Sequence, residues 1–319
     1  MNEFELISNY FSKISKKNKS ALNLNDDVFF DKNKGIAISI DTYLIGTHFV
    51  NFNSPKLVIK KILRSSISDL ICKGVKPKFY FISGSGNKKT FSKKNLSEVS
   101  LALQREQKKY NILLCGGDTT FSNKLSFTIN SLGYSDRIIY RNKAKLNDDI
   151  YVTGNLGDSF MGLQILKKKI KTNRKNYQFF TKMYYHPKLQ TKLCDHLFKF
   201  ANTSIDISDG LIDDLTKLIN RQNFSFQLYE KKLPISLNLK MLIKHKNLKK
   251  MDVVSNGDDY QILFTANTNK KRIIKNISKN TGIKITKIGK IISNKKRSIV
   301  IDAKGKEIKA NKKGYIHQF

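Results

Sequence analysis

Residues 35–41 read Gly-Ile-Ala-Ile-Ser-Ile-Asp, an apolar run that ends on a carboxylate. Its isoleucines alternate with small residues, which predicts a β-strand with Asp41 at its end. On both sides of this run, strand-like stretches alternate with longer segments of helical periodicity, a pattern typical of a mixed α/β protein. In this part of the chain we expect helices at residues 55–74 and 92–109, and further strands at residues 78–83, 111–115 and 125–134.

A polar stretch at residues 141–149 separates this first block from a second one. The second block repeats the alternation, with a helix expected from Asp209 and strands expected at residues 150–153, 204–207, Val253-Val254 and after Tyr260. No low-complexity linker lies between the blocks, so we expect them to pack directly together. The predicted fold class is α/β (α+β) with two domains, residues 1–147 and 148–319.

The N-terminal segment carries acidic residues where a secretory signal peptide would carry positive charge. Phe4, Ile7, Phe11 and Ile14 recur at helical spacing, so we expect an amphipathic first helix there. No stretch approaches the ~18 consecutive apolar residues that span a bilayer. We therefore expect no association with a membrane.

The three cysteines are far apart and odd in number. Cys72, Cys115 and Cys194 therefore favour neither a disulfide framework nor a zinc site. This usage is typical of a reducing compartment, so we expect a cytoplasmic protein.

The chain is strongly basic, with 60 Lys+Arg against 25 Asp+Glu and a formal net charge of +35. Such a charge raises the possibility of a nucleic-acid-binding protein. However, 52 of these residues are lysine and only 8 are arginine, the residue favoured for bidentate contacts to phosphates and bases. Together with 30 asparagines, this composition indicates a coding bias that fills exposed positions with lysine. We expect no specific nucleic-acid partner, and keep a non-catalytic nucleic-acid binder as the alternative.

The scarce acidic residues concentrate where strands are expected to end or the chain to turn. The residues placed in this way include Asp26-Asp27, Asp41, Asp69, Asp118, Asp206, Asp209 and Asp258-Asp259. Carboxylates placed in this way suit hard divalent cations that also bind phosphate oxygens. Singly, each also fits an ordinary cap or turn, and Asp69 on an apolar helix either faces solvent or needs a partner. Their number in so basic a chain favours a shared metal site.

A glycine-rich turn, Gly116-Gly117-Asp118-Thr119, follows the expected strand at residues 111–115. Glycines let backbone N–H groups approach a phosphate, whereas a carboxylate there would meet the phosphate only through a cation. No Walker-type lysine motif occurs, and we interpret residues 154–159 as a tight strand-to-helix turn. The histidines have no local Cys or Ser partner, so metal-assisted phosphoryl transfer is the favoured class of reaction.

The acidic and glycine motifs also stand in a characteristic order. In sequence they are Asp26-Asp27, Ser39-Ile40-Asp41, Ser68-Asp69-Leu70, residues 116–120, 151–159, 206–210 and 257–260, and Lys313-Gly314-Tyr315. This order resembles that of the thiamine-monophosphate kinase family, over essentially the whole chain. The resemblance also implies the wider superfamily that includes aminoimidazole ribonucleotide synthetase, selenophosphate synthetase and a hydrogenase-maturation protein.

The resemblance implies that the γ-phosphoryl group of ATP is transferred to thiamine monophosphate, giving thiamine diphosphate and ADP. It also implies a homodimer formed through the sheet of the N-terminal domains, with ATP and several Mg²⁺ in the cleft between domains. The implied metal contacts are Asp27, Ser39, Ile40 (by its backbone, since it replaces a hydroxyl residue), Asp41, Asp69, Asp118, Asp206 and Asp209. The implied nucleotide contacts are Gly117, Asp118, Arg141 and Ser208, and the implied substrate contacts are His48, Asp258 and Tyr315.

No general base or covalent residue is assigned, because the acceptor phosphate has a second pKa of about 6 and is largely ionised at neutral pH.

The chain departs from the family pattern in three places. Residues 23–25 replace a glycine-rich loop, Asn256 replaces a glycine, and Asp258 stands where a glutamate is usual. Two other members of the superfamily fit the chain less well. Selenophosphate synthetase has a reactive cysteine or selenocysteine near its N-terminus and the hydrogenase-maturation protein ends in a cysteine, whereas this chain has neither.

Overall fold

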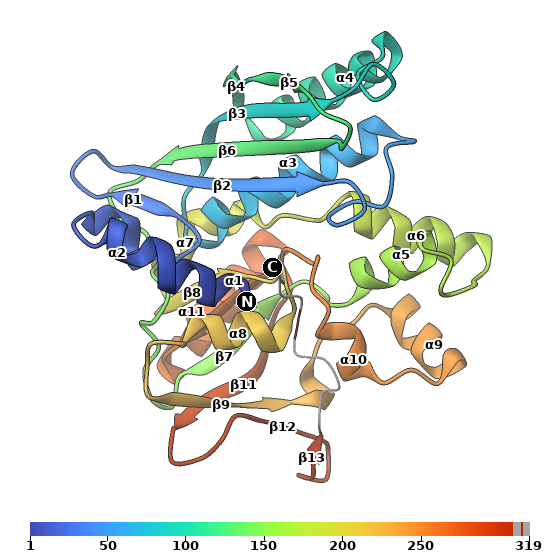
Figure 1. Cartoon of the computed structure of the whole chain (residues 1–319). Coiled ribbons are helices and arrows are strands. Elements are labelled where there is room, and N and C mark those ends of the chain that lie inside the picture. The colour runs from blue at the N-terminus through green and yellow to red at the C-terminus, as the bar shows by residue number, and fades with distance from the viewer. Residues whose placement is uncertain (309–313, 315–319) are drawn as a thin grey trace.

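The computed structural model describes residues 1–308 and Gly314 (Figure 1). It has two halves, each built around one β-sheet, with helices packed against and between them. The expected α/β class is therefore confirmed. The two sheets divide between Tyr134 and Asp149, while the domain boundary at residue 147 stays a prediction.

The first sheet has the strand order β1-β2-β6-β3-β4, and β5 also pairs with β3. Its strands are β1 (Phe29–Asp31), β2 (Ile36–Leu44), β3 (Pro77–Gly86), β4 (Leu113–Gly116), β5 (Thr119–Phe121) and β6 (Ser126–Tyr134). The three long strands β2, β6 and β3 run antiparallel, whereas β4 and β5 run parallel to β3. Strand β1 pairs with β2 only at residues 36–38, so the edge of β2 beyond Ile38 is open on that side.

Strand β2 is longer than its sequence suggested. It continues past Asp41 because Thr42, Tyr43 and Leu44 keep pairing with β6, with the Tyr43 side chain buried on the inner face. The prediction that Asp41 ends the strand was therefore wrong. Asp41 instead lies inside β2, on the stretch whose edge is open.

Helices α3 (Pro55–Cys72) and α4 (Lys93–Tyr110) pack side by side, and α3 also contacts the inner face of the first sheet and strand β8 of the second. Pro55 stands at the first helical position, where its fixed φ suits a helix start. The helix ends before Gly74, which takes φ 80°. Ser92 begins α4 by accepting the N–H of Asn95 on its hydroxyl.

The outer face of the first sheet carries apolar side chains that no described helix covers. Ile40 and Phe81 both pair with Asn130 of β6 and therefore share this face. Ile40 is 64% exposed and Tyr134 is 55% exposed. Isolated exposed apolar residues are common, but a row of them across neighbouring strands marks a contact surface.

The second sheet has the order β13-β12-β9-β11-β7-β10-β8. Its strands are β7 (Asp149–Thr153), β8 (Thr203–Asp206), β9 (Phe224–Tyr229), β10 (Ile262–Ala266), β11 (Ile285–Ser293), β12 (Ile299–Ile301) and β13 (Glu307–Ile308). Its helices are α5 (Asp158–Leu166), α6 (Arg174–Tyr185), α7 (Cys194–Leu197), α8 (Leu211–Leu218), α9 (Leu237–Lys246), α10 (Lys250–Val254) and α11 (Lys271–Thr281).

The expected strand at Val253-Val254 was wrong, because both residues belong to helix α10. Val253 packs with Met161 of α5 and Leu239 of α9, while Val254 joins the core beneath the second sheet. Tertiary packing thus overrides the β-propensity of two adjacent valines.

The N-terminal segment is helical, as expected, but it is interrupted by a π-helical turn. It comprises α1 (Glu3–Leu6), the π-helix Ile7–Phe11 and α2 (Ser12–Ser15). Its apolar residues do not join the core, since Phe11 is 50% and Ile14 80% exposed. The segment lies beside α8 at the junction of the two halves, with the Phe4 ring centroid 5.4 Å from Lys217 Nζ (Figure 1).

The loop that follows, a 3₁₀ segment at Lys19–Leu24, ends in an unusual backbone conformation. Leu22, Asn23 and Leu24 all take positive φ, between 51° and 57°. Reciprocal amide hydrogen bonds of 3.1 and 3.0 Å join Asn25 to Asn220, and Arg221 Nη2 donates to the Asn23 carbonyl at 3.2 Å. The loop is thereby fastened to the second half of the molecule.

Among the described residues, no helix has both the length and the apolar character needed to cross a bilayer.

Candidate functional site

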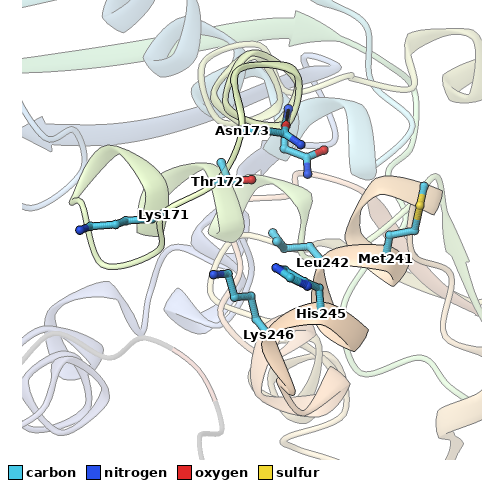
Figure 2. A pocket seen from close by; sticks show the side chains of 8 residues that line it. Lys171, Thr172, Asn173, Met241, Leu242, His245 and Lys246 are labelled. Atoms are coloured by element: carbon cyan, nitrogen blue, oxygen red, sulfur yellow. Dashed lines mark hydrogen bonds between the residues drawn. The ribbon is translucent and has the colours of Figure 1, made fainter.

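A cleft of about 1090 Å³ lies between the two halves. The first half lines it with β2, α3 and the loop at residues 23–27, and the second half with the turn after β8, with α8 and with the turn before β10. A separate hollow of about 560 Å³ lies between the start of α6 and helix α9, where Leu242, His245 and Lys246 face Thr172 and Asn173 (Figure 2). The residues lining that hollow include no carboxylate, so it does not extend the acidic cleft.

Three residues of α3 line the cleft at four-residue spacing, namely Lys61, Ser65 and Asp69. Residues four apart lie one above the other on a helix face, so these side chains form a single row. With a rise of ~1.5 Å per residue, Lys61 and Asp69 are separated by about 12 Å along the helix. The row connects two polar groups at opposite ends of the cleft.

At one end, Asp41, Asp69 and Asp206 come together from β2, α3 and β8. Burial raises the pKa of Asp41 to about 6, and the charge of Asp209 raises it further. Burial likewise raises the pKa of Asp206 to about 6, with Asp41 adding to the effect. The pKa of Asp69 is raised well above its usual range by burial and by the other two carboxylates. The three groups therefore repel one another when ionised.

The hydrogen bonds at this end fit a cation-binding role for these carboxylates. Ser39 Oγ donates to Asp69 Oδ2 at 2.6 Å, and the Tyr43 hydroxyl donates to Asp41 Oδ2 at 3.1 Å. Asp206 Oδ2 is buried, yet it has no hydrogen-bond partner among the described residues. A buried oxygen of this kind needs a partner, and a group of hard carboxylate oxygens is the ligand set that Mg²⁺ takes in proteins.

Asp26 and Asp27 line the cleft from the preceding loop and are held by two cations. Lys73 Nζ lies 2.6 Å from Asp26 Oδ1 and 2.8 Å from Asp27 Oδ2, and also donates to the Ser204 carbonyl. Arg141 forms an ion pair with Asp27 and donates its backbone N–H to Asp26 at 2.9 Å. Burial alone would lower the pKa of Lys73, but Asp26 and the neighbouring Cys72 and Asp69 together raise it above its usual value, so the lysine stays charged.

A second acidic group follows in α8. Lys217 Nζ contacts Asp209 and lies 2.8 Å from Asp213 Oδ2, while Asp214 accepts the backbone N–H groups of Asp209 and Gly210. Burial, followed by the charge of Asp209, raises the pKa of Asp214 well above its usual range. A Cβ on Gly314 would lie 2.4 Å from Asp213 Cβ, so Gly314 packs closely against this group. Tyr315 itself lies outside the described residues.

At the other end of the row, Lys61 Nζ lies 2.5 Å from Asp258 Oδ1, which also accepts the Tyr260 hydroxyl at 3.0 Å. His48 lines the same part of the cleft, and its Nδ1 accepts the backbone N–H of Leu44 at 3.0 Å. Ser208 lines the cleft and accepts the N–H of Asp258 on its carbonyl. The turns that carry Asp258 and Ser208 are thus adjacent.

The turn at residues 154–159 is a strand-to-helix turn, as predicted from the missing lysine. The carboxylate of Asp259 accepts the N–H of Gly157 at 2.7 Å and that of Ser159 at 3.5 Å. An internal carboxylate thus occupies the N-terminus of α5, where a phosphate would otherwise bind.

Two predicted nucleotide contacts do not reach the cleft of their own chain. Gly117 and Asp118 join β4 to β5, and neither lines the cleft. Three strand spacings separate β5 from β2, on the order of 15 Å across the sheet. A Cβ on Gly117 would lie 1.8 Å from the Ile82 carbonyl oxygen, so close packing on β3 explains that glycine. Ile40 lines the cleft at the open edge of β2, but its side chain lies on the outer face of the sheet.

Sequence reasoning missed three lysines of the site. Lys61 and Lys73 are buried on or beside α3, and Lys217 on α8 contacts three aspartates. The interpretation of lysine as solvent-facing background was wrong at these positions. Lys61 stands among apolar helical residues and lies eight residues before Asp69, and this periodicity was the available signal.

Gly257 is a position where the site depends on the absence of a side chain. Its φ is 68°, and a Cβ there would lie 2.1 Å from the Ser208 carbonyl oxygen. Gly257→Ala is expected to shift Ser208 and Asp258, lower kcat/KM at least about tenfold and destabilise the fold by more than about 2 kcal/mol. Gly282→Ala is the matched control, since Gly282 has φ 67° but open space around it. Equal losses of stability, measured by urea unfolding, would contradict the role of the close approach.

Comparison with known proteins agrees with this geometry. Residues 23–134 match the model of the family described as AIR synthase related protein, N-terminal domain. A thiamine-monophosphate kinase from Buchnera aphidicola subsp. Acyrthosiphon pisum is 33% identical over 99% of this chain and 98% of its own length. The chain belongs to the thiamine-monophosphate kinase family.

Solved structures of the family support the same assignment. A chain named AaThiL, complexed with AMPPCP and TMP, superposes with a TM-score of 0.85 at 26% identity, over 99% of this chain and 97% of that one. Thiamine monophosphate kinase from Aquifex aeolicus superposes with a TM-score of 0.79 at 26% identity, over 97% of this chain and 99% of that one. The two-sheet fold is therefore that of the thiamine-monophosphate kinase family.

Proposed function

We propose that this protein transfers the γ-phosphoryl group of ATP to thiamine monophosphate and forms thiamine diphosphate and ADP. The observation that carries the proposal is the convergence of Asp41, Asp69 and Asp206 in a cleft between two sheets, where a buried Asp206 oxygen has no hydrogen-bond partner among residues 1–308 and Gly314. Family membership and the relative complexed with AMPPCP, an ATP analogue, and TMP support it.

The chemistry requires two phosphate-bearing molecules to approach each other. Mg²⁺ bound by these carboxylates would neutralise phosphate charge and align the reacting groups. The acceptor is a phosphate oxygen with a second pKa of about 6, so it needs no general base. In this chain Arg141, Lys73 and Lys217 hold the outer aspartates in place, and the row on α3 sets the distance between the two ends of the cleft.

We propose the following roles for individual residues. Asp27, Ser39, Asp41, Asp69, Asp206 and Asp209, with the backbone of Ile40, serve as metal contacts from within the chain. Arg141 and Ser208 contact the nucleotide. His48 and Asp258 contact thiamine monophosphate, and Tyr315 is assigned to the same substrate by resemblance alone.

Gly117 and Asp118 need a second copy of the chain if they are to contact nucleotide and metal. The uncovered apolar face of the first sheet, which includes Ile40 and Phe81, suits a homodimer interface. A copy packed on this face would bring its β4–β5 turn toward the open edge of β2. Sedimentation equilibrium at micromolar protein is expected to give twice the 36.7 kDa mass of the chain.

A cytoplasmic location fits the cysteine usage. Cys72, Cys115 and Cys194 are all free thiols, and Cys115 is exposed. An exposed thiol persists in a reducing compartment.

The decisive experiment incubates the purified protein with ATP, Mg²⁺ and thiamine monophosphate and follows thiamine diphosphate and ADP by chromatography. Equal amounts of the two products are expected, and EDTA should abolish both. Release of ADP without thiamine diphosphate, or transfer only to another phosphorylated acceptor, would refute the assignment.

A further inference from the structure

Lys61 is a buried lysine whose charged end lies in the cleft. Its side chain is 1% exposed, and Nζ lies 2.5 Å from Asp258 Oδ1 and 4.1 Å from the centroid of the Tyr184 ring. The Tyr260 ring centroid lies 5.6 Å away. Burying an ion pair usually stabilises a fold no more than apolar side chains of the same volume would. The placement of Lys61 therefore indicates a role in the cleft and not only in packing.

Asp258 uses only one of its two carboxylate oxygens in these contacts. Oδ1 accepts hydrogen bonds from both Lys61 and Tyr260, and no described residue donates to Oδ2. The side chain remains 22% exposed and lines the cleft. Its backbone is also fixed, because Asp258 has φ 64° and donates its N–H to the Ser208 carbonyl at 2.8 Å. One oxygen is thus restrained while the other faces the cleft.

The charges of Lys61 and Asp258 determine which kind of ligand group Asp258 Oδ2 can bind. Lys61 and Asp258 neutralise each other, so Oδ2 is a hydrogen-bond acceptor on an ion pair of no net charge. Such an acceptor suits an N–H donor on a neutral group better than a cation, which Lys61 would repel. Thiamine monophosphate offers both kinds of group, a thiazolium cation and an aminopyrimidine with a neutral exocyclic amine.

The geometry of α3 separates this acceptor from the acidic end of the cleft. Lys61 lies about 12 Å along the helix from Asp69. The aminopyrimidine is the part of thiamine monophosphate farthest from its phosphate. With the phosphate at the acidic end, the amine would therefore lie near Asp258.

We propose that Lys61 is a positioning residue that sets substrate specificity, because it restrains Asp258 so that Oδ2 accepts the exocyclic amine of the aminopyrimidine. This inference rests on the proposed function and deepens it. Asp258 thereby recognises the amine by accepting its hydrogen bond, while other residues contact the thiazolium cation. Tyr260 assists through its hydroxyl.

The test compares thiamine monophosphate with the analogue that carries a carbonyl in place of the amine. A site built around an N–H donor discriminates strongly against a ligand that lacks it, so wild-type kcat/KM is expected to favour the amine by at least about a hundredfold. Lys61→Met is expected to raise KM for thiamine monophosphate about tenfold, to leave KM for ATP unchanged, and to reduce the preference below about tenfold. If Lys61 had only a structural role, Lys61→Met would lower kcat/KM for thiamine monophosphate and for its carbonyl analogue by the same factor.

The neighbouring Lys60→Met is the matched control, because Lys60 lies on the same helix but does not line the cleft. It is expected to keep both KM and the preference. If Lys61→Met does not fold, Tyr260→Phe decides, since it removes the second donor to Oδ1 and should reduce the preference severalfold. An unchanged preference in a folded Lys61→Met, or in Tyr260→Phe if that variant decides, would overturn the inference.

Failure of the proposed function can be told apart from failure of this inference. If the wild-type protein transfers no phosphoryl group to thiamine monophosphate, the proposed function fails by itself. The positioning role of Lys61 is then tested by calorimetry, which measures the binding of thiamine monophosphate and of its carbonyl analogue to the wild type and the variants. Equal affinities of the wild type for amine and carbonyl compounds would overturn its role.

Discussion

Asp41→Asn is expected to lower kcat by about three orders of magnitude while the fold remains intact. The asparagine keeps the shape of the side chain but removes the charge that helps to hold a cation between phosphates, a contribution of several kcal/mol. The measurement is kcat with saturating ATP, Mg²⁺ and thiamine monophosphate. Asp136→Asn is the control, because that side chain is 88% exposed and lies outside the cleft. A rate within tenfold of wild type would reject the role of Asp41.

The same substitution should stabilise the metal-free protein at neutral pH. Burial raises the pKa of Asp41 to about 6 from the 3.8 of an exposed carboxyl, so the folded state binds this proton more tightly than the unfolded state. Stability is therefore lost as the pH rises from about 4 through about 6, and the asparagine escapes this loss. The variant should melt several degrees above wild type at neutral pH in EDTA and show little gain below about pH 4. A gain that does not depend on pH would contradict the carboxyl repulsion.

Mixing two inactive variants is expected to restore activity if Asp118 acts in the cleft of a second copy. Asp41→Asn and Asp118→Asn should each be nearly inactive alone. Random exchange of subunits makes half of the dimers mixed, and each mixed dimer has one cleft with both aspartates intact, so about a quarter of wild-type activity should return. The variants are purified separately, mixed under mild dissociating conditions and assayed after reassociation.

The control for this experiment pairs Asp41→Asn with Asp69→Asn. Both residues line the same cleft of one chain, so every mixed dimer has one defect in each cleft and no activity should return. Recovery with this pair, or none with the Asp118 pair in a confirmed mixed dimer, would contradict the proposed origin of Asp118.

Much of the first sheet could be predicted from the sequence, because its strands are marked by local alternation. Strand β6 and helices α3 and α4 lie close to their expected ranges. The convergence of Asp41, Asp69 and Asp206 follows the order of motifs, and each lies on a regular element that fixes its direction. Local patterns and tertiary structure agree at these positions.

The features that could not be predicted from the sequence are those that depend on contacts between residues far apart along the chain. Lys61 meets Asp258 across 197 positions, and although helical periodicity places Lys61 on the same face as Asp69, no local pattern identifies Asp258 as its partner. The helical state of Val253 is decided by its packing against α5 and α9. The position of Asp118 outside its own cleft depends on the strand order, which local periodicity does not specify.

The loop at residues 22–25 forms one border of the cleft. Two leucines held at positive φ cost roughly 2–4 kcal/mol together. Three exposed hydrogen bonds, two between Asn25 and Asn220 and one from Arg221, return about the same amount. The fastened and released states of this loop are thus nearly equal in free energy. Releasing this loop to widen the cleft beside Asp26 and Asp27 would therefore cost little free energy.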